Sequence, residues 1–243
     1  MSSLAQHIVS SYDSDLDRLT ISLSELGHLV EVMVSDAVLS LKTRNVELAD
    51  DVIKRDAFAN RLQAQIDTDT MRILALRSPM ATDLRRTVGS IRVASDLERI
   101  GDLSEGIAKR SRYLTRYPAH NAVAGLARMG RQVRAQLSKA LDAFLREDAA
   151  AAMQIWIADQ EIDALYNGVL RDIVSEMATD PDTVEAATAL LFTAKNLERI
   201  GDHTSNICEV IYFTQHGKQL IDDNAVQALL QTGHDDDTTD RAR

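Results

Sequence analysis

A six-residue string occurs twice in this chain and constrains its fold more than any other feature. Leu97-Glu98-Arg99-Ile100-Gly101-Asp102 recurs unchanged as Leu197–Asp202, at an offset of 100 residues. Ala94 and Ile107 match Ala194 and Ile207 at the same offset. So many identities in one register are hard to attribute to chance. The 243-residue chain is therefore predicted to contain two copies of one structural unit.

Apolar residues follow a helical period. Near the start they alternate at steps of four and three, as Tyr12, Leu16, Leu19, Leu23, Leu26, Val30, Met33 and Ala37. This heptad spacing is typical of a helix that packs in a left-handed bundle. The chain has only 3 prolines and 10 glycines, and aromatic residues make up 4 %. Sandwiches and barrels need more turn residues and aromatic strands, so an all-β fold is excluded.

Capping and breaking residues divide the periodic sequence into helices. In the first half, Asn45 is expected to cap a second helix, Ser78-Pro79 to end it, and a third to run over about 81–113. A linker is expected at 117–121. In the second half, a fourth helix is marked by Leu126, Val133, Leu137, Ala140, Leu141 and Phe144, a fifth spans about 148–179, and a sixth begins after Asp180-Pro181 and ends at Gly217.

The expected fold class is therefore all-α, with two tandem, pseudo-symmetric three-helix bundles and six long helices. We predict one bundle over residues 1–117, a second over 118–221, and an acidic, flexible tail over 222–243 that contains Asp235-Asp236-Asp237.

The net charge and the cysteine content limit the classes of function and the compartment that are expected for this chain. The net charge of −10 disfavours binding to the phosphate backbone of nucleic acids, so no direct nucleic-acid role is expected. The single cysteine, Cys208, permits no internal disulfide and fits a reducing cytoplasm. We find no signal peptide pattern and no apolar run of about 18 residues, so we expect a cytoplasmic protein without a membrane span.

The repeated string contains a pair of carboxylates in each half. Glu98 and Asp102 are four residues apart, as are Glu198 and Asp202, so each pair lies on one helix face. Like charges at this spacing destabilise a helix by a few tenths of a kcal/mol. That this cost is repeated in both halves indicates a use for the acidic face.

Carboxylates without thiolates favour hard cations, such as magnesium, calcium, manganese or iron. One pair provides too few ligands, but the second helix of each half offers Asp56 with Asn60, and Asp159 with Asp163. We expect antiparallel packing to bring these residues beside the pairs in the repeated string. The alternative interpretation is that Glu98 and Glu198 only pair with nearby arginines.

At these residues the sequence resembles the PhoU family of bacterial phosphate-signalling proteins. The resemblance covers about residues 10–220. It is carried by the E/D-x-x-x-D motif of both halves, the string Asn196-Leu197-Glu198-Arg199-Ile200-Gly201-Asp202-His203, and Pro79-Met80-Ala81-x-Asp83-Leu84-Arg85. It implies two three-helix bundles side by side and a homodimer.

The resemblance also implies a role without catalysis. Proteins of this kind link a phosphate ABC importer to a sensor histidine kinase, and they keep phosphate-starvation genes repressed when phosphate is plentiful. Partners would be the importer ATPase and the kinase, with contact to the membrane only through them.

The resemblance further implies multinuclear sites for divalent or trivalent metal ions, which would be iron, manganese, magnesium or zinc. The matching ligands are Glu98, Asp102, Glu198 and Asp202, with Asp56, Asp159 and Asp163 as weaker ones. Asn60 departs from the pattern because it replaces a carboxylate.

Two other functions are also compatible with the sequence. One is a carboxylate-bridged metal-binding hydrolase or a metal-storage bundle. A ferritin-like di-iron site, however, needs Glu-x-x-His, and Gly101 and Gly201 stand three residues after the glutamates. The other is a purely structural helical module, which would bind no specific metal.

Overall fold

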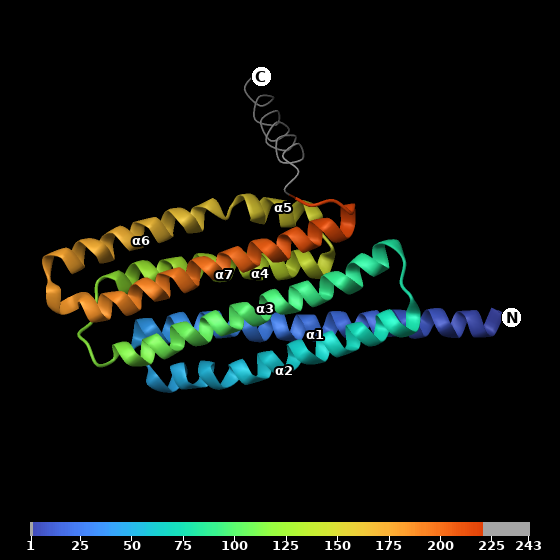
Figure 1. Cartoon of the computed structure of the whole chain (residues 1–243), viewed down its shortest axis with the longest axis horizontal. Coiled ribbons are helices and arrows are strands. Elements are labelled where there is room, and N and C mark those ends of the chain that lie inside the picture. The colour runs from blue at the N-terminus through green and yellow to red at the C-terminus, as the bar shows by residue number, and fades with distance from the viewer. Residues whose placement is uncertain (1, 221–243) are drawn as a thin grey trace, which may run out of the picture.

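The computed structural model describes the backbone of residues 2–220 and the side chains of residues 14–220. Within that range its regular elements are all helices: α1 (Ser2–Thr43), α2 (Val46–Arg77), α3 (Ala81–Leu114), α4 (Ala122–Arg146), α5 (Ala149–Ile157), α6 (Gln160–Thr179), a short 3-10 turn η1 (Pro181–Thr183) and α7 (Val184–His216). Figure 1 shows α1, α2 and α3 as one group of long rods and α4 to α7 as a second group beside it. The predicted all-α architecture is confirmed.

The helices of the first half begin and end where the sequence predicts. The side chain of Asn45 caps α2 by accepting a hydrogen bond from the backbone N–H of Leu48 at 3.0 Å. Ser78 ends α2 in a left-handed conformation, with φ of 46°, immediately before Pro79. The heptad residues of α1 from Leu19 onward are buried, which fixes the face that this helix turns to its neighbours.

The fifth helix is not continuous, which corrects the expectation of one helix over 148–179. It divides into α5 and α6 at Ala158 and Asp159. The backbone N–H of Asp159 donates to the carbonyl of Trp156 rather than to that of Ile155. The Ile155 carbonyl instead accepts from Nε2 of Gln136 on α4, at 3.3 Å. A side chain from another helix therefore takes the place of a helical hydrogen bond.

The last helix starts later than expected. Asp180 caps the segment as predicted, because its side chain accepts from the backbone N–H of Asp182 at 3.1 Å. Pro181–Thr183 forms a 3-10 turn, so α7 begins at Val184. Gly217, with φ of 68°, ends α7 in the left-handed conformation that glycine adopts without strain.

The two halves share one hydrophobic core rather than two separate ones. α3 packs along α7, and α1 packs along α4. The contact between α1 and α4 is close: a Cβ atom at Gly130 would lie 2.5 Å from Cγ2 of Val38, and one at Gly27 would lie 2.7 Å from Cδ2 of Leu141. Glycine at these positions lets the helices approach without a clash.

The predicted boundary between residues 117 and 118 falls in the segment that joins α3 to α4. The predicted acidic tail over 222–243 lies outside the described residues. Among residues 2–220, no helix is long and apolar enough to cross a membrane.

Candidate functional site

The repeated string lies on α3 and α7, which run side by side in opposite directions (Figure 1). Nδ2 of Asn196 donates to the carbonyl of Leu103 at 3.0 Å. Asp96 accepts from Nδ2 of Asn206 at 3.2 Å and lies 2.9 Å from Nδ1 of His203. Asp96 is equivalent to Asn196, and Leu103 to His203, at the offset of 100 residues. The two contacts are therefore equivalent, and an approximate two-fold axis between α3 and α7 relates the two copies of the string.

The first acidic cluster comprises Asp56 from α2 and Glu98, Asp102 and Glu105 from α3. Burial raises the pKa of Asp56, and the charges of Glu105 and Asp102 raise it further. Burial also raises the pKa of Glu98, with a second contribution from Asp102 and a smaller one from Asp56. These mutual effects show that the predicted residues of α2 and α3 lie together. Asn60 joins them, because its Nδ2 donates to Oδ2 of Asp56 at 3.2 Å.

The second acidic cluster comprises Asp159 immediately before α6, Asp163 in α6, and Glu198 and Asp202 in α7. The pKa of Asp202 is raised first by burial, then by the charge of Glu198, then by Asp159, with a smaller effect of Asp163. One cation offsets this repulsion in part, because Nζ of Lys195 lies 2.6 Å from Oε1 of Glu198. The structure thus brings together the second set of predicted residues.

The glycine within each copy of the string lets the neighbouring helix approach. A Cβ atom at Gly201 would lie 3.2 Å from Oδ1 of Asp159 and 3.2 Å from Cδ1 of Ile162. The equivalent atom at Gly101 would lie 3.6 Å from Cβ of Ala59, which is an ordinary contact. Glycine is therefore needed most in the second half, where it allows Asp159 to sit against α7.

Sequence reasoning missed two residues at this site. Glu105 belongs to the first cluster, but Ser205 stands at its equivalent in the second half, so the repeat did not reveal it. Its spacing of three residues from Asp102 places both on one helix face, and this spacing could have identified Glu105 from the sequence. Gln136 positions Asp159 by donating from Nε2 to its Oδ1 at 3.2 Å. No local pattern marks Gln136, because its partners lie 19 and 23 residues away.

Comparison with known proteins places the chain in a family. The model of the PhoU domain matches it twice, over residues 23–111 and 126–211. The chain belongs to the PhoU domain family. Both matches include one copy of the repeated string, so each half of the chain corresponds to one domain of the family.

Similar proteins match along nearly their whole length. The phosphate-specific transport system accessory protein PhoU homolog of Caulobacter vibrioides is 38% identical over 218 residues, which cover 89% of this chain and 95% of that protein. The accessory protein PhoU of Serratia marcescens is 32% identical over 229 residues, which cover 93% and 94%. These names denote accessory proteins, in agreement with the non-enzymatic role expected for this chain.

Solved structures show the same fold. The crystal structure of PhoU from Pseudomonas aeruginosa aligns with a TM-score of 0.83 and 34% identity, covering 85% of this chain and 100% of that one. The phosphate transport system regulatory protein PhoU from Streptococcus pneumoniae gives a TM-score of 0.80 and 32% identity, covering 86% and 99%.

Two observations bear on whether metal fits the PhoU-type acidic clusters. Oδ1 of Asp56 and Oε2 of Glu198 are buried and accept no hydrogen bond, and each is a suitable ligand for a hard cation. However, among the described residues no three His, Cys, Asp or Glu side chains are grouped closely enough to hold an ion. The donor chemistry fits a metal, whereas the side chains as placed form pairs rather than a complete ligand shell.

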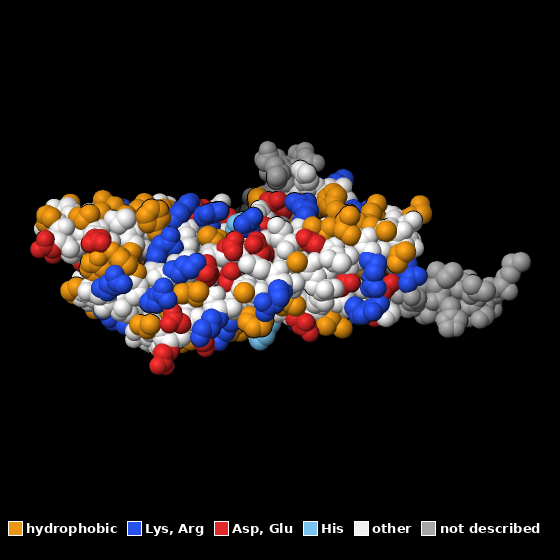
Figure 2. All heavy atoms as spheres, turned by 60° about the horizontal axis from the view of Figure 1, so that its bottom comes forward, with side chains coloured by type: hydrophobic (Ala, Val, Ile, Leu, Met, Phe, Trp, Pro, Cys, Tyr) orange, Lys and Arg blue, Asp and Glu red, His pale blue; other side chains and the backbone are white. Residues whose placement is uncertain are grey.

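Basic side chains surround the acidic ones. Figure 2 shows Asp and Glu side chains near the middle of the face in view, with Lys and Arg side chains around them. Arg99 pairs with Asp102 at 3.2 Å and with Glu98 at 3.5 Å, and Lys109 pairs with Glu105 at 2.6 Å. These exposed pairs are each worth less than about 1 kcal/mol, so they would yield readily to a competing cation.

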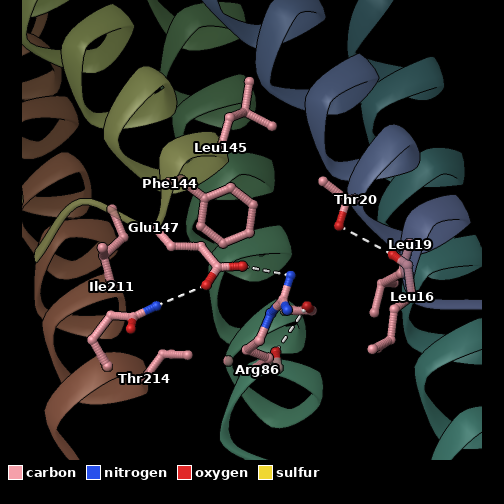
Figure 3. Close-up of a pocket in the computed structure, with 12 residues that line it drawn as sticks. Leu16, Leu19, Thr20, Arg86, Phe144, Leu145, Glu147, Ile211 and Thr214 are labelled. Carbon is pink, nitrogen blue, oxygen red and sulfur yellow. Dashed lines mark hydrogen bonds and ion pairs between the residues drawn. The ribbon is translucent and has the colours of Figure 1, made fainter. Parts of the chain in front are cut away.

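A separate hollow lies between the two halves, lined by α1, α3, α4 and α7 (Figure 3). Its charged groups are already paired. Nη2 of Arg86 lies 2.6 Å from Oε1 of Glu147, and Nε2 of Gln215 donates to Oε2 of Glu147 at 2.9 Å. The rest of the lining is largely apolar, with Leu16, Phe144 and Ile211 among it. The hollow therefore offers no free charge to a polar ligand.

Proposed function

We propose that this protein is a non-enzymatic regulator of phosphate-specific transport and of phosphate-starvation signalling. The observation that carries this proposal is the match to an accessory protein of the phosphate-specific transport system, at 38% identity over 95% of that protein. The family's two domains, its repeated acidic string and its long-helix architecture are all present in this chain. Sequence identity that extends over most of both chains favours a shared role.

In the proposed mechanism the protein is an adaptor. It docks on the ATPase of a phosphate ABC importer and on a sensor histidine kinase, and it stabilises the inactive or phosphatase state of the kinase when phosphate is plentiful. Such an adaptor acts through its differential affinity for the two states of the kinase, which needs no catalytic residue in the protein itself.

Metal ions have a structural part in this proposal. Glu98, Asp102 and Asp56 would hold one site and Glu198, Asp202, Asp159 and Asp163 the other. A bound cation would neutralise carboxylates that now repel one another, as the raised pKa values of Asp56, Glu98 and Asp202 indicate. The metal would thereby fix the charge and shape of the face formed by α3 and α7.

Deletion of the gene tests the regulatory role. We expect a phosphate-starvation reporter to be derepressed in high phosphate, and the parental gene to restore repression. Affinity capture of the tagged protein from phosphate-rich cells should recover the importer ATPase and the sensor kinase. Unchanged reporter output in the deletion strain would refute the proposal.

The metal sites need a separate measurement. The double variant Glu198→Ala with Asp202→Ala should contain less bound metal than the parent by elemental analysis. Asp51→Ala with Asp172→Ala is the matched control, because it removes two exposed carboxylates that lie outside both clusters. Equal metal content in all three proteins would eliminate the second cluster as a metal site. A phosphatase assay with added manganese or iron distinguishes the adaptor from a metal-dependent hydrolase.

A further inference from the structure

A second hollow lies where the end of α1, the end of α3, the start of α4 and the first third of α7 meet. We call it the linker hollow, because Pro118, Ala119 and His120 of the connecting segment form part of its wall. It holds about 420 Å³ of space, part of it open to solvent. Its apolar lining includes Leu114 and Leu190, and its polar lining is Lys42, Arg44, Ser111 and His120.

Ser111 carries a buried hydroxyl without a partner. The residue is 2% exposed, and its Oγ forms no hydrogen bond. Eight other buried helical hydroxyls donate to the carbonyl three or four residues earlier in their own helix, and among the described residues only Ser205 shares the unpaired state of Ser111. The eight are Ser40, Thr70, Thr87, Ser90, Ser104, Thr193, Thr204 and Thr214. A buried hydroxyl left unpaired destabilises the fold, so Ser111 departs from the pattern of most buried hydroxyls in this protein.

His120 places a second buried polar atom at the same hollow. Its side chain is 7% exposed. Nδ1 accepts a hydrogen bond from the backbone N–H of Ala122 at 3.2 Å, so Nε2 carries the proton of the neutral ring. Nε2 has no hydrogen-bond acceptor. Oε2 of Glu176 lies 3.5 Å from Nε2, which is long for a hydrogen bond but close enough for an ion pair when the ring is protonated.

The charge at the linker hollow is positive. Lys42 and Arg44 line it and no carboxylate does, although Oε2 of Glu176 lies 3.5 Å from Nε2 of His120. Lys42 has no ion-pair partner among residues 14–220, and Nη2 of Arg44 donates to the carbonyls of Thr115 and Tyr117. The start of α4 adds the partial positive charge of a helix N-terminus. This differs from the hollow of Figure 3, where the cation Arg86 is paired with Glu147.

We propose that the linker hollow binds a small oxyanion of the phosphate or sulfate type. Its oxygens would accept hydrogen bonds from Oγ of Ser111 and Nε2 of His120, and Lys42 and Arg44 would supply the balancing charge. The ligand thereby gives a hydrogen-bond acceptor to Oγ of Ser111 and to Nε2 of His120, which otherwise has only the carboxylate of Glu176 at 3.5 Å. Because the hollow is walled by elements of both halves and by their linker, a bound ion joins the two halves at this end of the molecule.

The oxyanion has two chemical sources, a free inorganic ion or the phosphoryl group of a larger molecule. Titration calorimetry on the full-length protein distinguishes the two sources. The buffer contains a chelator, so that phosphate cannot bind through a metal ion. Inorganic phosphate is the probe in one arm and AMP in the other. We expect saturable binding of one ion per chain below about 10 mM phosphate. Tighter binding of AMP than of phosphate identifies a phosphorylated molecule as the ligand class, and weaker binding identifies the free ion.

Variants of the lining residues test the site itself. Ser111→Ala should weaken binding about tenfold, because it removes one hydrogen bond to a charged group. His120→Asn should have a similar effect, since asparagine still accepts from Ala122 and so keeps the helix cap, but lacks Nε2. Lys42→Gln should weaken binding and reduce its dependence on salt.

Ser205→Ala is the matched control, because Ser205 is the other buried hydroxyl without a partner in the described part of the chain and does not line the hollow. Its affinity should equal that of the parent. Without ligand, Ser111→Ala should melt at the parental temperature or above, which separates a lost ligand contact from a damaged fold. The proposal fails if neither probe binds saturably, or if Ser111→Ala binds as tightly as the parent.

Discussion

The two acidic clusters share one sequence string but differ in how the rest of the molecule holds them. In the first, Asp56 projects from the uninterrupted helix α2, and its neighbour in the cluster is the amide of Asn60. In the second, Asp159 sits at the break between α5 and α6, where Gln136 of α4 donates to it. The second cluster is thus anchored by a third helix, and the first is not.

This difference shows that a duplicated sequence does not guarantee a duplicated site. Both copies of the repeat carry two carboxylates on the central helix, but the residues that face them differ between the halves. The first cluster includes Glu105 with its partner Lys109, and the second includes the ion pair of Lys195 with Glu198. We therefore expect the two cores to respond alike to substitution, and the two sites to respond differently.

The largest expected effect tests the equivalence of the cores. Ile100→Ala and Ile200→Ala each remove a side chain that is 0% exposed, so each should lower the free energy of unfolding by about 2–5 kcal/mol. Chemical denaturation of the full chain measures both losses. If only one variant is destabilised, the two halves are not equivalent in packing and the comparison fails.

A smaller effect should be confined to the second half. Gln136→Leu removes the donor to the Ile155 carbonyl and to Asp159, which leaves both acceptors unpaired and should cost about 1–3 kcal/mol in unfolding free energy. Gln132→Leu, on the same helix, is the control, because it removes only an exposed hydrogen bond to Glu161 and should change stability by less than about 0.5 kcal/mol. Equal losses in the two variants would contradict the anchoring of Asp159 by Gln136.

Replacing each glycine of the string by alanine should change the stability of the protein in opposite directions. Gly101→Ala meets only ordinary contacts, so better helix propensity should stabilise the protein by about 0.5–1 kcal/mol. Gly201→Ala brings a methyl group to 3.2 Å from Asp159 and Ile162, which should cancel that gain and destabilise the protein by about 1 kcal/mol. Thermal unfolding of the two variants measures the difference. A gain of equal size at both positions would show that α5 and α6 pack against α7 no more closely than α2 packs against α3.

The smallest effect depends on pH. The pKa values of Asp56 and Asp202 are raised in the folded state, so the folded protein binds these protons more tightly than the unfolded chain does. Their contribution to stability is present below the unfolded value of 3.8 and is lost as the pH rises through the folded value. At neutral pH, Asp56→Asn and Asp202→Asn should therefore be more stable than the parent. Because neither residue is fully buried, solvent screening should keep the gain to a few tenths of a kcal/mol.

Denaturation curves at pH 7 and at pH 3 check this expectation, and the gain should vanish at pH 3. Asp51→Asn, outside both clusters, controls for the loss of one negative charge. With manganese added at pH 7, the parent should gain stability over both variants if the clusters bind metal. A variant that is less stable than the parent at pH 7 without metal would show that its carboxylate is not under repulsion.

Much of this protein was determined by its sequence alone. The heptad spacing of α1, the caps at Asn45 and Gly217, and the offset of the string predicted the helices, the duplication and the helix face of each carboxylate. These features are local or periodic, so the residues that cause them are visible along the chain. The resemblance to the PhoU family rested on the same residues.

Other features were decided only in the tertiary structure. The break at Ala158 and Asp159 has no proline or glycine to announce it, because it arises from Gln136 on another helix. Glu105 enters the first cluster through its charge, which raises the pKa of Asp56 from the neighbouring helix, and the repeat does not contain this residue. The linker hollow joins Lys42 of α1, Ser111 of α3 and His120 of the connecting segment, which carry no common motif. Each of these depends on which side chains meet across helices, and spacing along a single helix does not specify that.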